Sequence, residues 1–296
     1  MTRPLVLWLL LAAAQLLSPV PAGAETLKIS TWNLDWLTAR TRAEANLPAD
    51  VHPRAPADFA RLAAYANKLD ADIVGFQEVD GPAAAALVFD PARYRILTIN
   101  EPVVQRVGLA VRLGIRVDRN PDVTDLDVEP LAPFRLRDGL DATLTLPGGQ
   151  RLRILVVHLK TGCQTDSLAQ SNRLQCALLA RQIPPLAAWV AARGREAVPF
   201  LLMGDFNRVL DDTGEPGREE LGAALAQAAP LTRATAGLSN PCWEGAAFID
   251  HIFAGGPARA WLVSGSLRVQ VFQETDDMFK QRLSDHCPVS VKLKIP

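Results

Sequence analysis

Short stretches in which apolar and polar residues alternate recur along the chain from residue 27 onward, separated by turn residues. Alternation with a period of two predicts strands with one buried face, and short apolar runs predict strands buried on both faces. Pro147, Gly148 and Gly149 mark a hairpin between two of these runs. Strands are therefore predicted at residues 27–32, 72–77, 107–112, 141–146, 152–157, 198–203, 247–254, 261–271 and 288–295.

Helical spacing of apolar residues occurs in fewer places. It predicts a helix at residues 59–69 behind Asp58 as N-cap, a helix at 167–183 and a weaker one at 219–228. Pro184 and Pro185 are expected to stop or kink the second helix, which continues over residues 186–192. Residues 121–133, with three prolines and four acidic residues, read as a surface loop.

Many strands with a few helices between them indicate the fold class. Helices lying outside two packed sheets predict an α/β fold, a four-layered α/β sandwich of two packed, mostly antiparallel sheets flanked by helices. After residue 24 the chain has no low-complexity linker, charge block or internal repeat. We therefore expect residues 25–296 to form one domain, and we expect it to be a monomer.

The first 24 residues have the pattern of an export signal. Arg3 precedes an apolar stretch over residues 5–17, and Ala22, Gly23 and Ala24 form a small-residue cleavage site. The apolar stretch is too short to span a bilayer comfortably, which ranks an uncleaved anchor second. No later segment is apolar for long enough to cross a membrane. The sequence thus predicts a secreted or periplasmic protein, cleaved near Ala24.

Four cysteines in an exported chain permit disulfides. Cys163 and Cys176 bracket a short polar loop and form the preferred pair. Closing a loop of that size stabilises a fold by roughly 3 kcal/mol in the chain-entropy model. Cys242 and Cys287 are a possible second pair, which the sequence leaves open.

Polar side chains with catalytic or metal-binding chemistry stand at the ends of the predicted strands, where a core strand needs none. They are Asn33, Glu78, His158, Asp205, Asn207, Asp250, His251, Asp285 and His286. Such groups would be costly in a dry interior without partners, so we expect them to converge at one edge. Carboxylates of this kind suit Mg²⁺ or Mn²⁺, and the chain has no thiolate cluster that would favour zinc. A carboxylate-braced imidazole beside a metal favours hydrolysis of a phosphate ester by water.

Six short motifs, in order, carry a resemblance to a known family. They are TWNLD at 31–35, QE at 77–78, HLK at 158–160, GDFN at 204–207, ID at 249–250 and SDH at 284–286. Each alone is weak, but together they resemble the endonuclease/exonuclease/phosphatase superfamily over most of the chain. That superfamily contains secreted deoxyribonucleases, abasic-site endonucleases, sphingomyelinases, inositol-polyphosphate phosphatases and non-catalytic relatives.

The resemblance implies a role for each motif residue. Glu78 would be the principal metal ligand, helped by Asn33 and Asp285, with Asp35 nearby through water. Asp205 would orient or activate the attacking water, and Asn207 would position that water or the phosphate. His286, braced by Asp250, would act as general base or phosphate contact. His158 would act on the opposite side, stabilising the phosphorane or protonating the leaving oxygen.

Several other polar and aromatic residues are weaker candidates. Arg137 and Arg173 are possible phosphate contacts, although solvated arginines are common. Trp36 and Trp243 lie beside a motif or in a loop and could line the cleft. His251 should face away from Asp250 on a regular strand and is read as structural. His52 is read as loop surface.

The balance of acidic and basic residues restricts the kind of nucleic-acid binding that is expected. A formal net charge of −1 provides no footprint for clamping long nucleic acid, which argues against a tight, processive DNA binder but not against a nuclease. The leading interpretation is an exported, metal-dependent phosphodiester hydrolase, a nuclease with nucleic acid as its substrate. A sphingomyelinase-like or small-phosphoester hydrolase would need an exposed apolar hairpin, for which residues 261–263 and 271–272 are weak candidates. A non-catalytic binding protein on the same fold is the remaining alternative, against which the intact motif set argues.

Overall fold

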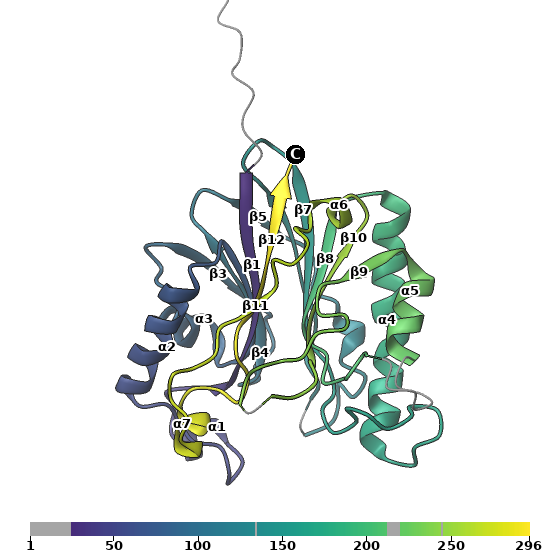
Figure 1. Ribbon diagram of the computed structural model, residues 1–296. Coiled ribbons are helices and arrows are strands. Elements are labelled where there is room, and N and C mark those ends of the chain that lie inside the picture. The colour runs from purple at the N-terminus through teal and green to yellow at the C-terminus, as the bar shows by residue number, and fades with distance from the viewer. Residues whose placement is uncertain (1–24, 134, 212–219, 244) are drawn as a thin grey trace, which may run out of the picture.

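The computed structural model describes residues 25–133, 135–211, 220–243 and 245–296; the predicted export signal lies outside them. Within these residues the strands form two six-stranded sheets that pack face to face (Figure 1). The order in the first sheet is β11 (Arg268–Val269), β12 (Val289–Ile295), β1 (Glu25–Leu37), β2 (Ile73–Val79), β4 (Arg106–Arg112) and β3 (Tyr94–Thr98). The order in the second is β5 (Arg116–Arg119), β6 (Leu140–Thr145), β7 (Arg151–His158), β8 (Phe200–Asp205), β10 (Asp250–Gly255) and β9 (Leu231–Arg233).

Each sheet is antiparallel apart from one central pair. β1 and β2 run parallel in the first sheet, and β7 and β8 run parallel in the second. Helices α2 (Pro56–Leu69) and α3 (Gly81–Ala86) lie outside the first sheet, and α4 (Leu174–Glu196) and α5 (Glu220–Ala228) lie outside the second (Figure 1). The short segments are α1 (Arg42–Ala45), η1 (Thr124–Leu126), α6 (Ala258–Trp261) and α7 (Asp277–Arg282). The predicted four-layered sandwich is confirmed.

Three apolar clusters hold the four layers together. Strand alternation sends Ile154 into the cluster between the two sheets and the adjacent Leu155 into the cluster beneath α4. In the first sheet, Ile73 enters the cluster between the sheets, whereas Val74 packs in the cluster under α2 and α3. Both faces of the central strands are therefore buried, which explains why their sequences are almost uniformly apolar.

The second predicted helix is wrong at its start, and the stop considered at its prolines does not occur. The helix begins at Leu174, because Glu220 accepts hydrogen bonds from the backbone of residues 168 and 169 and holds this segment as a turn. It then runs unbroken through Pro184 and Pro185. Leu179 and Leu186, on either side of the prolines, are both fully buried against the second sheet, so packing offsets the lost helical hydrogen bonds.

Two further predictions need correction. Asp58 is the third helical residue rather than the N-cap; its carboxylate accepts a hydrogen bond from the backbone N–H of Ala55, 2.9 Å away. The strand predicted at 261–271 is mostly absent, since Trp261 ends α6 and Gly265, with φ +66°, forms a turn. Only Arg268–Val269 pairs as a short edge strand.

Among the described residues, no helix combines the length and the apolarity that a membrane span requires.

Candidate active site

The two parallel strand pairs bring polar side chains to the same edge of the sandwich. In the first sheet Asn33 stands opposite Gln77, directly before Glu78. In the second sheet His158 stands opposite Asp205, and antiparallel β10 places Asp250 opposite Asp205 from the other side. Residues far apart in sequence thus meet because each lies at the edge end of its strand.

Gly204 makes the close approach of β8 to β7 possible just before Asp205. A Cβ atom at this position would lie 2.0 Å from the carbonyl oxygen of Val157, and the glycine has φ +144°. A side chain cannot be accommodated in that conformation. The glycine of the GDFN motif is therefore required by backbone geometry, and it sets the position of the carboxylate that follows.

Asn33 links the two sheets through its side-chain amide. Its Nδ2 donates to Glu78 Oε1 and to Asp205 Oδ2, both at 3.0 Å. Its Oδ1 accepts a hydrogen bond from the backbone N–H of Asp35 at 2.9 Å. Asn33 therefore holds the two carboxylates with its NH₂ group, while its amide oxygen faces the end of β1.

The Asp205 carboxylate accepts three hydrogen bonds, one of them from Asn33. Asn207 donates to it twice, from its backbone N–H at 2.7 Å and from its Nδ2 at 3.1 Å. Burial raises the pKa of Asp205 to about 7, with the charge of Asp250 adding to the effect and that of His286 opposing it. A carboxylate with a pKa near neutrality is suited to accepting a proton from water.

His286 and Asp250 form a charge-assisted pair. The His286 Nδ1 lies 2.6 Å from Asp250 Oδ2, and its Nε2 lies 3.8 Å from Asp205 Oδ2. Burial lowers the pKa of His286, but the charges of Asp250, Asp285 and Asp205 outweigh it and hold that pKa well above the ordinary value. The ring is thus an imidazolium at neutral pH and faces the cleft with Nε2.

His158 approaches the same Asp205 carboxylate as His286 but differs from it in charge. Its Nε2 is 3.4 Å from Glu78 Oε1 and 3.7 Å from Asp205 Oδ2. Burial, reinforced by the nearby cations Arg137 and Lys160, holds the pKa of His158 well below the ordinary value. Its Nδ1 is buried and has no hydrogen-bond partner within the described part of the chain. His158 is therefore neutral and offers a single N–H.

Three carboxylates crowd at the end of β1. Burial, followed by the negative charges of Asp285 and Glu78, raises the pKa of Asp35 to about 7. The buried guanidinium of Arg54, 3.3 Å from Asp35 Oδ2, opposes this rise only in part. Such an excess of carboxylate over positive charge fits a hard divalent cation. A second possible metal-binding group consists of Glu78, His158 and Asp205, whose ligand atoms lie within 4.8 Å of one another.

Two residues that the sequence interpretation missed support the site. Gln105 donates to Glu78 Oε2 at 2.5 Å and accepts a hydrogen bond from Arg137 at 3.5 Å. Arg54 donates to the carbonyl oxygens of Asp35, at 2.6 Å, and Leu283, at 3.1 Å. Both come from segments without a motif, so the sequence carries no local signal for them.

A cleft of about 1620 Å³ covers this edge of the sandwich. Of the predicted site residues, it is lined by Asp35, Glu78, Arg137, His158, Asp205, Asn207, Asp250, Asp285 and His286, and Trp36 and Trp243 also line it. Asn33 lies just beneath, bonded to Glu78 and Asp205.

Three of the weaker candidates lie elsewhere. Arg173 is not among the lining residues and forms an exposed ion pair with Asp166 at 2.7 Å. His251 is buried, 2.6 Å from Thr235 Oγ1, and burial lowers its pKa to about 3. His52 is exposed outside the regular elements.

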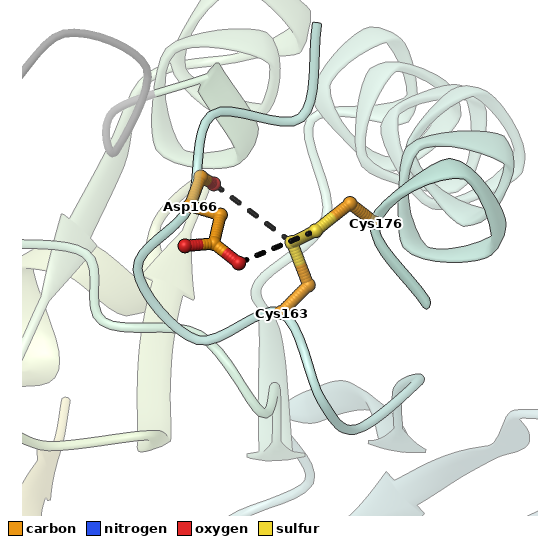
Figure 2. Close-up of side chains that lie close together, drawn as sticks. All are labelled: Cys163, Asp166 and Cys176. Carbon is orange, nitrogen blue, oxygen red and sulfur yellow. Dashed lines mark hydrogen bonds between the residues drawn. A yellow bond between two sulfur atoms is a disulfide. The ribbon is translucent and has the colours of Figure 1, made fainter. Parts of the chain in front are cut away.

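The structure joins Cys163 to Cys176 and Cys242 to Cys287. Figure 2 shows the first disulfide beside Asp166, whose backbone and carboxylate oxygens lie 3.8 and 3.9 Å from the sulfurs. Because the sulfurs are bonded to each other, this group is not a thiolate metal site. Gln164 and Thr165, directly after Cys163, line the cleft, so the disulfide anchors one of its walls.

The family model described as "Endonuclease/Exonuclease/phosphatase family" matches residues 30–286. Truncated TDP2 from Caenorhabditis elegans is 16% identical, with a TM-score of 0.58 over 91% of this chain and 98% of that one. A family protein from Bacteroides thetaiotaomicron is 16% identical, with a TM-score of 0.56 over 93% and 100% of the two chains. The 3′ phosphatase NExo from Neisseria, bound to a product DNA hairpin, is 17% identical, with a TM-score of 0.56 over 90% and 99%. At these identities the likeness concerns the fold, and no curated protein matches this chain.

Proposed function

This chain belongs to the endonuclease/exonuclease/phosphatase family, and on that basis we propose that it is a divalent-metal-dependent nuclease that hydrolyses a phosphodiester by in-line attack of water. The arrangement around Asp205 is the observation that carries the proposal. Asn33 connects Asp205 to Glu78, and the His286–Asp250 pair stands beside it. This arrangement supports a mechanism in which a carboxylate, an imidazolium and a metal-binding group act at one point of the cleft.

The three carboxylates that gather near the end of β1, from Asp35, Glu78 and Asp285, would hold the metal. Glu78 would be the principal ligand, with Asp285 and Asp35, whose charges act on one another, completing the acidic group. A bound Mg²⁺ or Mn²⁺ would neutralise charge on the phosphate. Asn33 presents its NH₂ group to Glu78, so we assign it the task of orienting that carboxylate. Gln105 restrains the other oxygen of Glu78 from the opposite wall.

The attacking water would be oriented by Asp205 and Asn207. Asp205 accepts its proton, which the pKa of about 7 permits at neutral pH. The imidazolium of His286, held by Asp250, would contact a non-bridging phosphate oxygen through Nε2. The Nε2–H donor of His286 is thus fixed by Asp250 before the substrate arrives, as electrostatic stabilisation of a transition state requires.

Arg137 and His158 would contact the phosphate from the opposite side. The buried Arg137 guanidinium has no ion pair among the described residues, and its Nε lacks a hydrogen-bond partner. The neutral His158 ring adds one N–H. Removal of a cation from water without an anionic partner is costly. An anionic substrate group beside Arg137 would therefore stabilise the guanidinium and be stabilised by it.

A sphingomyelinase-like hydrolase is the second candidate, and one observation favours it. Leu131 is 98% exposed and Leu174 is 69% exposed, and Leu174, Ala132 and Pro133 line the cleft. In the segments named from the sequence, Trp261 and Phe272 are buried and only Val271 is exposed, at 41%, so they supply no larger apolar surface. The apolar surface formed by Leu131, Ala132, Pro133 and Leu174 is small compared with the surfaces that mark membrane contact.

A panel assay tests these alternatives. Plasmid DNA, RNA, sphingomyelin vesicles and bis(p-nitrophenyl) phosphate would be incubated with the protein and Mg²⁺, and again with EDTA. We expect EDTA-sensitive cleavage of nucleic acid, abolished by Asp205→Asn and retained by Asp118→Asn, a half-exposed aspartate on β5 outside the cleft. Cleavage of sphingomyelin alone would favour the second candidate. Absence of hydrolysis with all four substrates would favour a binding protein.

Export is part of the same proposal. The two disulfides among the described residues, both after residue 24, are compatible with an oxidising compartment. N-terminal sequencing of the protein recovered from an expressing cell tests it, with Glu25 as the expected first residue.

A further inference from the structure

We propose that the indole ring of Trp36 forms a nucleobase-binding subsite beside the metal-binding residues, so that the substrate is a polynucleotide with an unpaired base next to the scissile phosphate. The inference rests on the proposed function and deepens it. It is carried by the backbone of Trp36, by a ring that has no partner among the described residues, and by the cations that line the same cleft.

The backbone places the Trp36 ring in the cleft against local preference. Asp35 and Trp36 have φ +46° and +52°, a left-handed conformation that favours glycine and is rare for bulky residues. Leu34 and Leu37 on either side are fully buried, so the two residues between them turn outward. The backbone N–H of Trp36 donates to Glu78 Oε2 at 3.2 Å, which ties this turn to the carboxylate proposed as the principal metal ligand.

The Trp36 ring is half-buried, and among the described residues it has no partner of its own. Within the part of the chain that the structure describes, its indole N–H makes no hydrogen bond, and no aromatic ring or cation packs on it. Trp243, which lines the same cleft, differs: its Nε1 donates to Ser284 O at 2.9 Å and its ring lies 5.5 Å from Phe272. Trp243 is held by the fold, whereas the face of Trp36 remains available for a flat ligand.

The charges around Trp36 suit a sugar–phosphate chain. Lys280, Lys160 and Arg137 line the cleft, and none has an ion pair among the described residues. Lys280 belongs to α7, whose end at Leu283 is tied to the Asp35 carbonyl through Arg54. Arg137 thus lies on the side of the cleft proposed to contact the phosphate, and Lys280 lies on the helix that Arg54 links to the Trp36 turn. A ligand that alternates phosphates with flat rings fits this pattern better than a lipid head group does.

The test compares two single-stranded oligonucleotides of equal length, one of thymidine nucleotides and one of abasic tetrahydrofuran residues. Both carry the same phosphates, so only the bases differ. We expect the parent, with Mg²⁺, to prefer the thymidine strand in kcat/KM. In Trp36→Ala the ratio of the two kcat/KM values should fall about 10- to 100-fold, the scale of a lost base–aromatic stack. Trp36→Phe should restore most of the ratio, and Leu113→Ala, an exposed residue outside the cleft, should leave it unchanged.

Two outcomes would overturn the inference. Equal losses on both strands in Trp36→Ala would show that the residue only shapes the turn, and an unchanged ratio would show that no base binds there. If the parent hydrolyses neither strand nor bis(p-nitrophenyl) phosphate, the proposed function fails. Fluorescence anisotropy of the two labelled strands then decides the subsite: base-dependent binding lost in Trp36→Ala supports it, and binding without base dependence rejects it.

Discussion

The His286–Asp250 pair permits a prediction in which activity and stability separate. Asp250 is almost fully buried, and its Oδ2 lies 2.6 Å from the His286 ring. Its Oδ1 has no hydrogen-bond partner in the segments that the structure describes. His286→Ala should lower the hydrolysis rate about 10²- to 10⁴-fold, the usual contribution of a positioned acid, base or cation. It also leaves a buried carboxylate without its counter-charge.

The stability cost follows from that unpaired carboxylate. Breaking a buried ion pair from one side costs about 3–5 kcal/mol, and protonation of Asp250 would reduce this towards the lower end. We therefore expect His286→Ala to lose about 3 kcal/mol of unfolding free energy. The double variant His286→Ala/Asp250→Asn removes the charge as well, so it should recover most of the stability while remaining inactive.

Rate against Mg²⁺ concentration and urea unfolding at neutral pH measure the two effects on the same proteins. His52→Ala, which alters an exposed histidine, is the matched control and should stay within about 0.5 kcal/mol and retain full activity. Near-parental activity in a folded His286→Ala protein would refute the catalytic assignment. An equal stability loss in the double variant would refute the unpaired-charge explanation.

Three further perturbations address other parts of the molecule. Glu78→Gln keeps the size of the side chain but removes its charge, so activity should fall and half-maximal rate should require more Mg²⁺; an unchanged requirement would exclude Glu78 as a ligand. Cys163→Ser/Cys176→Ser should unfold roughly 3 kcal/mol more easily, and peptide mapping of the native parent should find neither thiol open to alkylation. Burial, together with the charge of Asp138, raises the pKa of Glu101 from 4.5 to about 7. The stability contributed by the neutral carboxyl is therefore fully present below pH 4.5, and it is lost as the pH rises through 7. Glu101→Gln should gain on the order of 3 kcal/mol relative to the parent between pH 4.5 and 8, and a pH-independent difference in urea unfolding would contradict this.

The central strands were predictable because burial on both faces leaves a strong apolar signal. The edge strands β3, β5 and β9 were not, since they are short and partly exposed and their residues resemble loops. The start of α4 was missed for a different reason. Residues 167–173 are compatible with a helix locally, but Glu220, about fifty residues later in the chain, holds them as a turn.

The candidate site shows the same division between local and distant causes. Asn33, Glu78 and Asp205 end apolar strands, so their convergence at one edge could be expected from sequence. Gln105 could not, because it comes from a loop and acts by touching Glu78 across the cleft. Arg54 is equally hidden, since its contact with Leu283 joins residues separated by 229 positions.

Backbone strain at the cleft explains why periodicity alone could not describe it. Among the described residues, eight non-glycine residues have positive φ, and six of them line the cleft: Asp35, Trp36, Asn46, Glu78, Asn207 and Trp243. The other two, Asp70 and Ala197, follow the ends of helices, as Asn46 does at the end of α1, and a left-handed residue is an ordinary terminator there, so the strain is special to the remaining five. Strain of this kind persists only where the surrounding structure holds it, and it is concentrated at functional sites. At Glu78 the strand turns out of its regular path, which aims the carboxylate along the sheet edge towards Asn33 and Gln105 instead of into a sheet face. The strand-forming pattern thus brings the residues to the edge, and these irregular positions direct their side chains into the cleft.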